Sequence, residues 1–248
     1  MTESAATAPV HDATAAHRRT AGRALAPVAE PGALSGQQLQ ERATIHRTDD
    51  IRPEVDAFRE LRTRLLSAAR GNFITLVAPV SAGSGGSFVA RNLAAAFAFD
   101  PARSALLVDC DLRHPSQHRT LRIEPANGGL VDYLEDDGTD VARVIYATGV
   151  PGLSLLPAGH SRETGAEYFS SQRMRLLLDS LRSGHPTCHM VLDAPPVRGT
   201  PDARILANLA DLVVLVAGYG CDTPAAIAQA AAAFDPARFA GVVFNEGV

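Results

Sequence analysis

The sequence predicts an α/β protein built on a doubly wound, mostly parallel sheet with helices on both faces. Two observations favour this fold class. Short apolar runs alternate with helical patterns along most of the chain, which is the order that parallel βαβ units require. In addition, the first apolar run leads into a loop of glycine and serine and then into an alanine-rich helix. The length of 248 residues suits one such domain with an additional tail.

The composition excludes several classes of protein. Hydrophobic residues make up 46% of the chain, and the net charge of −4 argues against a general nucleic-acid binder. All 23 basic residues are arginine, so the chain contains no lysine. Cys110, Cys188 and Cys221 are predicted to be reduced, buried thiols. No apolar run reaches the roughly 18 residues of a membrane span, and the N-terminus lacks the apolar core of a secretory signal, so we expect a cytoplasmic protein.

The chain divides into a tail and a folded domain. Residues 1–48 are rich in alanine, threonine, proline and arginine, which predicts a disordered tail with a weak helical tendency at 36–45. The domain is expected over residues 49–248. Helices are predicted at 53–70, 87–99, 129–134, 167–182, 201–209 and 223–234, and strands at 73–78, 105–108, 153–156, 188–192, 212–217 and 241–245.

The first predicted helix carries a regular stripe of charge. Pro53 fits its first turn, and its apolar residues fall on one face. Asp56, Arg59 and Arg62 follow one another at intervals of three, so they share a second face. This stripe is either a solvated charged surface or a contact between subunits, and the residues alone leave both interpretations open.

The predicted strand at 73–78 and the helix at 87–99 frame a candidate phosphate site. Backbone N–H groups of a glycine-rich loop can cradle phosphate oxygens, and the helix N-terminus adds a favourable dipole. The usual motif ends in Gly-Lys-Ser or Gly-Lys-Thr, whereas this loop ends in Gly85-Gly86-Ser87. Glycine therefore stands where the lysine is expected. The candidate nucleotide-binding residues are Gly83, Ser84, Gly85, Gly86, Ser87 and Phe88.

Aspartates follow two of the later strands. Asp109 and Asp111 come after one apolar run, and Asp193 comes after another. Ligands of a parallel sheet sit beyond the carboxyl ends of its strands. Carboxylates in that position either hold a hydrated Mg²⁺ or cap the turn that follows. The candidate metal residues are Ser87, Asp109 and Asp193, and Asp109 and Asp111 are the candidate catalytic residues.

Taken together, these stretches resemble the cytoplasmic kinase domain of the bacterial tyrosine autokinases. The resemblance covers residues 53–246. The matching motifs are Asp109-x-Asp111-x-Arg113 (Walker A′), Val191-Leu192-Asp193-x-x-Pro196 (Walker B), the segment Gly199-Thr200-Pro201-Asp202-Ala203, and Asp56-x-x-Arg59-x-x-Arg62, which is similar to the family's Glu-x-x-Arg-x-x-Arg helix.

The resemblance implies a P-loop NTPase fold of the MinD/ParA-like superfamily, with ATP or ADP and Mg²⁺ as ligands. It also implies a role in exopolysaccharide or capsule production and a membrane chain-length determinant (polysaccharide co-polymerase) as partner. The protein is then expected at the inner face of the plasma membrane through that partner. The charged helix implies a homo-oligomeric ring.

Two departures from the family pattern bear on activity. Gly86 replaces the Walker lysine, which makes the Walker A loop degenerate. The family's tyrosine-rich C-terminal tail has no counterpart, because the chain ends at Val248 and its four tyrosines are dispersed within the domain. We therefore expect a regulator that is weak or inactive as a kinase, and we expect Gly86→Lys to tighten the binding of ATP and Mg²⁺.

Three alternatives stay open at this point. The retained aspartates favour an active tyrosine kinase or ATPase with an unconventional loop. A partition-type ATPase has the same fold, but such proteins keep signature lysines that this chain lacks. An NAD-binding protein fits Gly83-x-Gly85 and the acid Asp109, although Phe88 stands at the third glycine position and obstructs close packing.

Overall fold

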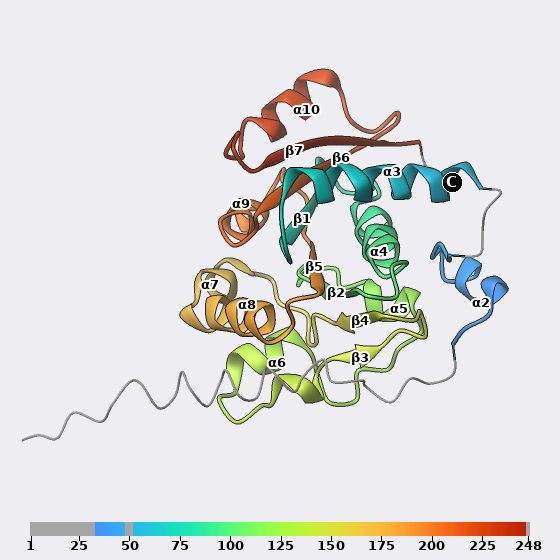
Figure 1. Ribbon diagram of the computed structural model, residues 1–248. Helices are drawn as coiled ribbons and strands as arrows, with labels where there is room; N and C mark the ends of the chain where they lie inside the picture. The colour runs from blue at the N-terminus through green and yellow to red at the C-terminus, as the bar shows by residue number, and fades with distance from the viewer. Residues whose placement is uncertain (1–32, 48–51, 247–248) are drawn as a thin grey trace, which may run out of the picture.

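The structure is a computed structural model that describes residues 33–47 and 52–246 (Figure 1). Its strands are β1 (Ile74–Pro79), β2 (Ser104–Asp109), β3 (Tyr146–Ala147), β4 (Leu153–Leu156), β5 (Cys188–Asp193), β6 (Leu212–Gly218) and β7 (Phe239–Asn245). Its helices are α2 (Gly36–Gln40), α3 (Pro53–Ala68), α4 (Gly86–Phe97), α5 (Gln117–Thr120), α6 (Leu130–Glu135), α7 (Ala166–Ser170), α8 (Gln172–Gly184), α9 (Asp202–Ala207) and α10 (Pro224–Ala231), with a 3₁₀ turn η1 at Val141–Arg143.

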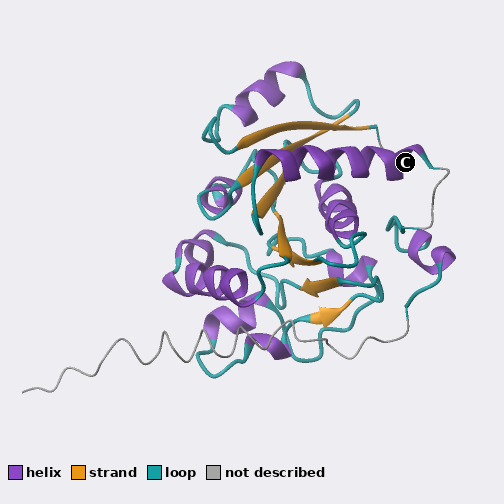
Figure 2. Cartoon of the chain, in the orientation of Figure 1, coloured by secondary structure: helices purple, strands orange, loops and turns teal. Residues whose placement is uncertain are grey.

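One sheet of seven strands runs through the centre of the molecule (Figure 2). Its order is β3-β4-β2-β5-β1-β6-β7, and only the short edge strand β3 runs antiparallel to its neighbour. Every residue of β1 and β5 is buried, as is typical of parallel strands that are covered on both faces. The predicted doubly wound, mostly parallel α/β fold is confirmed.

Helices cover the two faces of the sheet and divide the apolar core into two layers. One layer joins the sheet to α3 and α4, and the other joins it to α6, α7, α8, α9 and α10. Figure 1 shows α4 on one side of the strands and α7, α8 and α9 on the other. Helix α4 is apolar nearly all round because α3 packs on the surface that the sheet leaves free.

Several predicted elements differ from the structure. The predicted helix at 167–182 is two helices, because the hydroxyl of Ser171 accepts a hydrogen bond from Met174 N and starts α8 anew. Helix α5 and strand β3 were not predicted, since four and two residues are too few to show a period. Cys221 is exposed, so the expectation of three buried thiols is wrong for that residue and holds for Cys110 and Cys188.

The N-terminal boundary of the domain also differs. The predicted tail ended at residue 48, but residues 33–47 lie within the fold. We call this segment the strap. A capping box at Ser35 begins helix α2, and Leu39 and Ile45 are buried against the α4 side of the core. The apolar residues of the strap are too widely spaced to show a period, so composition alone indicated a tail. The rest of the predicted tail lies outside the described residues.

A buried asparagine fastens the strap to α4. Asn92 is fully buried; its side-chain oxygen accepts a hydrogen bond from Ile45 N at 2.7 Å, and its amide nitrogen donates to Ala43 O at 3.1 Å. A buried amide that satisfies two backbone groups of a distant segment fixes their positions, because an unpaired partner is costly.

We predict that Asn92→Ala lowers the free energy of unfolding by about 1–3 kcal/mol, since it leaves the Ile45 N–H and the Ala43 carbonyl without this partner. Chemical denaturation measures the change. Asn208→Ala is the matched control, because Asn208 is exposed at the end of α9 and its replacement is expected to change stability by less than about 0.5 kcal/mol. Equal losses in the two variants would contradict the proposed fastening.

Candidate functional site

The carboxyl edge of the sheet brings the predicted motifs together. The loop at 81–87 leaves the end of β1, Asp193 ends β5, and Asp109 ends β2. The register of β2 and β5 pairs Asp109 with Asp193, so the two carboxylates are neighbours. The parallel arrangement of the strands therefore assembles three segments that lie far apart in the sequence.

The loop presents backbone donors at the start of α4. Gly85 is the N-cap, with φ of +86° in the left-handed region, and no side chain caps this helix. The N–H groups of the first helical turn, Gly86 to Phe88, have no helical acceptor and are suited to an anion. A Cβ on Gly85 would lie 2.0 Å from the amide nitrogen of Asn245, which donates to Ser84 O at 3.2 Å. The left-handed conformation is what requires glycine at position 85, since the Asn245 side chain is flexible.

The space beside Gly86 is occupied by a proline ring. A Cβ at this position would lie 2.6 Å and 2.7 Å from the Cδ and Cγ atoms of Pro79. Carbon atoms do not approach so closely, and the pyrrolidine ring is rigid. A lysine stem at position 86 therefore has no room, and the expectation that Gly86→Lys alone tightens nucleotide binding needs revision.

An acidic residue that the sequence analysis missed lies against the loop. Ser84 is fully buried, and its hydroxyl donates to Asp222 Oδ2 at 2.6 Å; Gly218 N donates to the same oxygen at 2.9 Å. Burial acts to raise the pKa of Asp222, but these hydrogen bonds outweigh it and hold that pKa below its usual value. The Ser84 side chain thus closes the loop onto the end of β6. Asp222 follows an apolar strand, as Asp109 and Asp193 do, and the same pattern identifies it.

Asp109 and Asp111 both cap the turn after β2. Asp109 is fully buried and accepts hydrogen bonds from the backbone N–H groups of Asp111, Ser116 and Gln117 at 3.1–3.3 Å. Asp111 accepts one from His114 N at 3.0 Å. Burial and the neighbouring charge of Asp193 raise the pKa of Asp109 well above its usual value. These contacts are those of the capping alternative, and a catalytic role for either residue stays a prediction.

Asp193 belongs to a buried polar network. Burial raises its pKa to about 6, against hydrogen bonds from Gln117 and Ser87. Gln117, also fully buried, donates from Nε2 to Asp193 Oδ2 at 2.6 Å and to Ser87 O at 2.9 Å. Arg91 Nη1 in turn donates to Gln117 Oε1 at 3.1 Å. Sequence analysis missed Gln117, because it lies on the four-residue helix α5 and matches no motif.

Arg91 does not take the place of the missing lysine. Arg91 is 4% exposed, and its guanidinium donates to the strap at Ala43 O as well as to Gln117. Burial lowers its pKa to about 10, although the charge of Asp193 acts in the opposite sense. Arg113 is half-buried, and its charge acts to lower the pKa of Asp202. The contacts of Arg91 hold its charge behind the loop.

Phe88 and the charged stripe of α3 serve contacts within the chain. The Phe88 ring meets Phe58 edge-on at 5.9 Å between centroids, so only its backbone N–H is a candidate for ligand binding. Arg59 pairs with Asp56 at 3.1 Å, and Arg62 Nη1 donates to Ala96 O of α4 at 3.0 Å. The stripe is therefore more than a solvated surface. Its use between subunits stays a prediction.

The protein groups at the carboxyl edge suit a magnesium ion only if a bound nucleotide and water supply its other ligands. Within the described residues, no three His, Cys, Asp or Glu side chains are close enough together to hold a metal. Asp193 Oδ1 is nevertheless buried without a hydrogen-bond partner among those residues. This oxygen, the Ser87 hydroxyl and the adjacent Asp109 are hard donors of the type that Mg²⁺ selects. They suit an ion whose other ligands are nucleotide and water, and that ion would neutralise charge on the phosphates.

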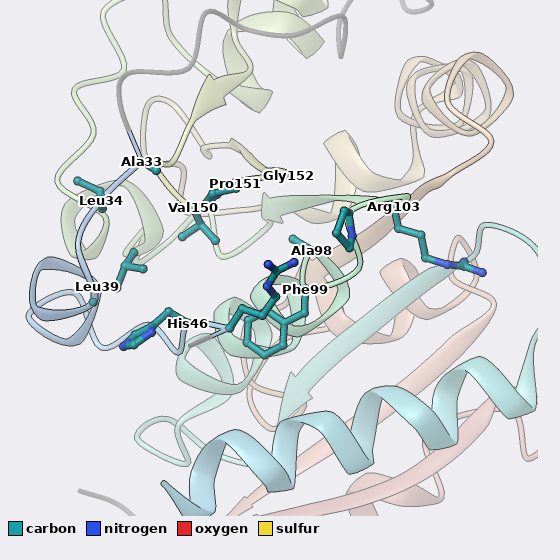
Figure 3. A pocket seen from close by; sticks show the side chains of 13 residues that line it. Ala33, Leu34, Leu39, His46, Ala98, Phe99, Arg103, Val150, Pro151 and Gly152 are labelled. Atoms are coloured by element: carbon teal, nitrogen blue, oxygen red, sulfur yellow. The ribbon is translucent and has the colours of Figure 1, made fainter. Parts of the chain in front are cut away.

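A cavity of about 560 Å³ lies at the opposite edge of the sheet (Figure 3). It is enclosed by the strap, the end of α4 and the segments that lead into β2 and β4. Leu34, Leu39, Phe99 and Val150 line it. No residue predicted for the nucleotide or metal site lines this cavity, and it is separate from the loop.

Comparison with known proteins identifies relatives among tyrosine kinases. No protein-family model matches the chain. It is 34% identical over 198 residues to the putative tyrosine-protein kinase EpsB of Ralstonia solanacearum, and the match covers 78% of this chain. It is 30% identical over 214 residues to the tyrosine-protein kinase YwqD of Bacillus subtilis, and the match covers 85% of this chain and 88% of YwqD. The chain belongs to the bacterial tyrosine-protein kinase family.

Solved structures share the fold of this chain. The kinase domain of the Escherichia coli tyrosine kinase ETK superimposes with a TM-score of 0.72 at 23% identity, covering 85% of this chain and 92% of that one. The BceF tyrosine kinase domain has a TM-score of 0.67 at 26% identity, covering 86% and 90%. The cell-division ATPase MinD of Pyrococcus furiosus shares the fold, with a TM-score of 0.57 over 70% of each chain. The expected P-loop NTPase fold is confirmed.

This family member spans only about a quarter of some relatives, since the match covers 26% of EpsB. Within the described residues, no helix is both long and apolar enough to cross a membrane. The sequence similarity to tyrosine kinases favours the kinase family over the NAD-binding and partition-type alternatives.

We predict that ionisation of the Asp193 carboxyl group lowers the free energy of unfolding as the pH rises. Its folded-state pKa of about 6 lies above the value of 3.8 for an exposed aspartate, so the folded protein retains a proton that the unfolded chain releases. This stabilising contribution is complete below about pH 4 and is lost as the pH rises through about 6. Relative to Asp193→Asn, the wild type should lose on the order of 1 kcal/mol or more of unfolding free energy between about pH 4 and 7.5.

Denaturation at both pH values, on both proteins, measures this difference. The buried His189 has a pKa lowered to about 4 by burial and by Arg103, so it changes stability with pH in the opposite direction. Its contribution is common to the two proteins and cancels in the comparison. Parallel pH profiles for wild type and Asp193→Asn would show that burial does not raise the pKa of the Asp193 carboxyl group.

Proposed function

We propose that this chain is a regulatory member of an exopolysaccharide or capsule system that retains a nucleotide-binding fold and transfers phosphate weakly or not at all. The observation that carries the proposal is the close approach of Pro79 to Gly86, which leaves no space for a Walker lysine. The polysaccharide context is supported by relatives such as the putative tyrosine-protein kinase in the cps region of Klebsiella pneumoniae, 28% identical over 195 residues.

The electrostatics of the loop support weak phosphoryl transfer. A well-placed positive group at a transferring phosphate stabilises the transition state by on the order of 3 kcal/mol. Here the loop lacks that group, and the carboxylate of Asp222 lies against it through Ser84. Arg91 is bound to the strap and Gln117. The backbone donors at Gly86 to Phe88 therefore face an anion without a neighbouring side-chain cation.

The retained groups support weak binding of ATP or ADP with Mg²⁺. Ser87, Asp109 and Asp193 would hold the metal, and Gly83 to Ser87 would wrap the phosphates. As in the polysaccharide kinases it resembles, the chain would act with a membrane chain-length determinant, which would place it at the inner face of the plasma membrane. The stripe of Asp56, Arg59 and Arg62 would contribute to a ring of subunits. Each of these roles is part of the proposal.

Incubation of the purified protein with radiolabelled ATP and Mg²⁺ tests the central claim. We expect little autophosphorylation, at a level that Asp109→Ala does not change. Strong labelling that Asp109→Ala abolishes would instead support the second candidate, an active kinase with an unconventional loop, which the retained aspartates favour. A tyrosine kinase of the same family with an intact lysine serves as the positive control.

We predict that restoring the lysine requires two substitutions. Gly86→Lys alone should destabilise the fold by about 1–3 kcal/mol, because its stem overlaps the Pro79 ring. Pro79→Ala removes the two closest ring atoms, so the double variant Pro79→Ala/Gly86→Lys should bind ATP and Mg²⁺ at least about tenfold more tightly than the wild type. Calorimetric titration of the wild type, both single variants and the double variant measures this. If Gly86→Lys alone were as stable and as tight as the double variant, the proline ring would not be the obstacle.

A further inference from the structure

We propose that the cavity beneath the strap is a binding site for a single-chain amphipathic anion, a fatty-acyl carboxylate. The apolar chain of this ligand would fill the cavity, and its carboxylate would meet the positive charge of Arg47, an exposed residue of the lining. The site goes beyond the proposed function, because the cavity is separate from the nucleotide loop and neither assignment depends on the other.

The strap encloses the cavity because it is anchored at two separate points. Leu34 N donates a hydrogen bond to Gly149 O at 3.0 Å, and Ile45 N donates to the side-chain oxygen of Asn92 at 2.7 Å. The strap, the end of α4 and the segment before β4 each contribute to the wall (Figure 3). The volume of about 560 Å³ lies within the range of roughly 300–1,000 Å³ that is usual for small-molecule sites.

Much of the wall is apolar and shielded from bulk solvent. Leu39, Phe99 and Val150 line the cavity and are 4%, 9% and 7% exposed. Figure 3 shows these three side chains around the same space. Protein interiors contain few voids larger than a water molecule, because the atoms around a void lose van der Waals contacts. A chain of methylene groups would restore those contacts, so the wall suits an apolar tail.

The charged side chains of the lining are all basic. His46, Arg47 and Arg103 belong to it, and none of the described lining residues is acidic. Arg103 has other partners, since its Nη1 lies 2.8 Å from His189 Nε2 and its Nε pairs with Asp100 at 3.4 Å. Figure 3 also shows the Arg103 side chain leading away from the other labelled residues. The ligand that this lining favours is therefore an anion, and Arg103 is not its main partner.

Arg47 is the residue best placed to bind the carboxylate. Its side chain is exposed, and no carboxylate of the described residues pairs with it. Its backbone carbonyl accepts a hydrogen bond from Arg59 Nη2 at 3.3 Å, and the Arg59 guanidinium lies over the Phe99 ring at 5.9 Å from the centroid. Arg59 is paired with Asp56 but adds positive charge on this side of the cavity. The planar fork of a guanidinium matches the two oxygens of a carboxylate.

Calorimetric titration of the full chain with decanoate tests the site. The wild type should bind decanoate with a Kd of about 10–100 µM, and octanoate, which is two methylene groups shorter, should bind about tenfold more weakly. The alcohol 1-decanol has the same tail without the charge, so it should also bind at least about tenfold more weakly than decanoate. A Kd for decanoate above about 1 mM overturns the proposal, and so does equal affinity for decanoate and octanoate.

Two variants test the tail and the head of the ligand separately. Ala98→Leu adds volume to the wall and should weaken decanoate binding at least about tenfold. Its matched control is Ala102→Leu, because Ala102 is exposed in the turn that follows α4 and is not a lining residue. Arg47→Gln should weaken decanoate binding about tenfold and leave 1-decanol binding unchanged. Its control is Arg175→Gln, since Arg175 is exposed on α8, which packs on the other face of the sheet.

The pattern across the variants decides the outcome. Equal losses in Ala98→Leu and Ala102→Leu overturn the proposal, because binding would then not depend on the volume of the cavity. Circular dichroism checks that each variant folds, and Arg47→Gln should fold in any case because Arg47 is exposed. If Ala98→Leu does not fold, unchanged decanoate affinity in Arg47→Gln overturns the proposal by itself. These titrations contain no nucleotide, so their failure leaves the proposed function as it stands.

Discussion

Two carboxylates buried side by side at the carboxyl edge of the sheet set the arrangement around them. Asp109 and Asp193 end adjacent strands, and both are cut off from solvent. Water cannot compensate their charge, so protein groups must do so. Helix α5 supplies backbone N–H groups to Asp109 and an amide to Asp193. Arg91 joins this network, and the strap holds Arg91 in place.

The loop beside these carboxylates keeps the backbone of a phosphate-binding turn without the usual lysine. Glycine at position 85 preserves the turn that points backbone donors at an anion. Glycine at position 86 does something different, because it lets α4 start directly against the Pro79 ring. The Pro79 ring fills the space that a side chain at position 86 would need. A single reverse substitution would therefore add a side chain where no volume remains.

The fold was largely predictable from the sequence. Buried parallel strands read as continuous apolar runs, and six of them were placed within a few residues of their observed bounds. The register of these strands then makes the meeting of the loop, Asp109 and Asp193 a consequence of topology. The strap could not be predicted in this way, because Leu39, Ile45 and the contacts of Asn92 depend on a surface that other parts of the chain create.

By itself, the sequence determined the fold class, the family and the candidate residues of the nucleotide site, since each depends on local pattern and order. Only the tertiary structure decided what surrounds those residues. Pro79 lies seven positions from Gly86 and Gln117 lies far from Asp193, yet each occupies space beside its partner. Such contacts depend on volume and hydrogen-bond geometry in three dimensions. The absence of the lysine therefore depends on the packing around residue 86 and not on that residue alone.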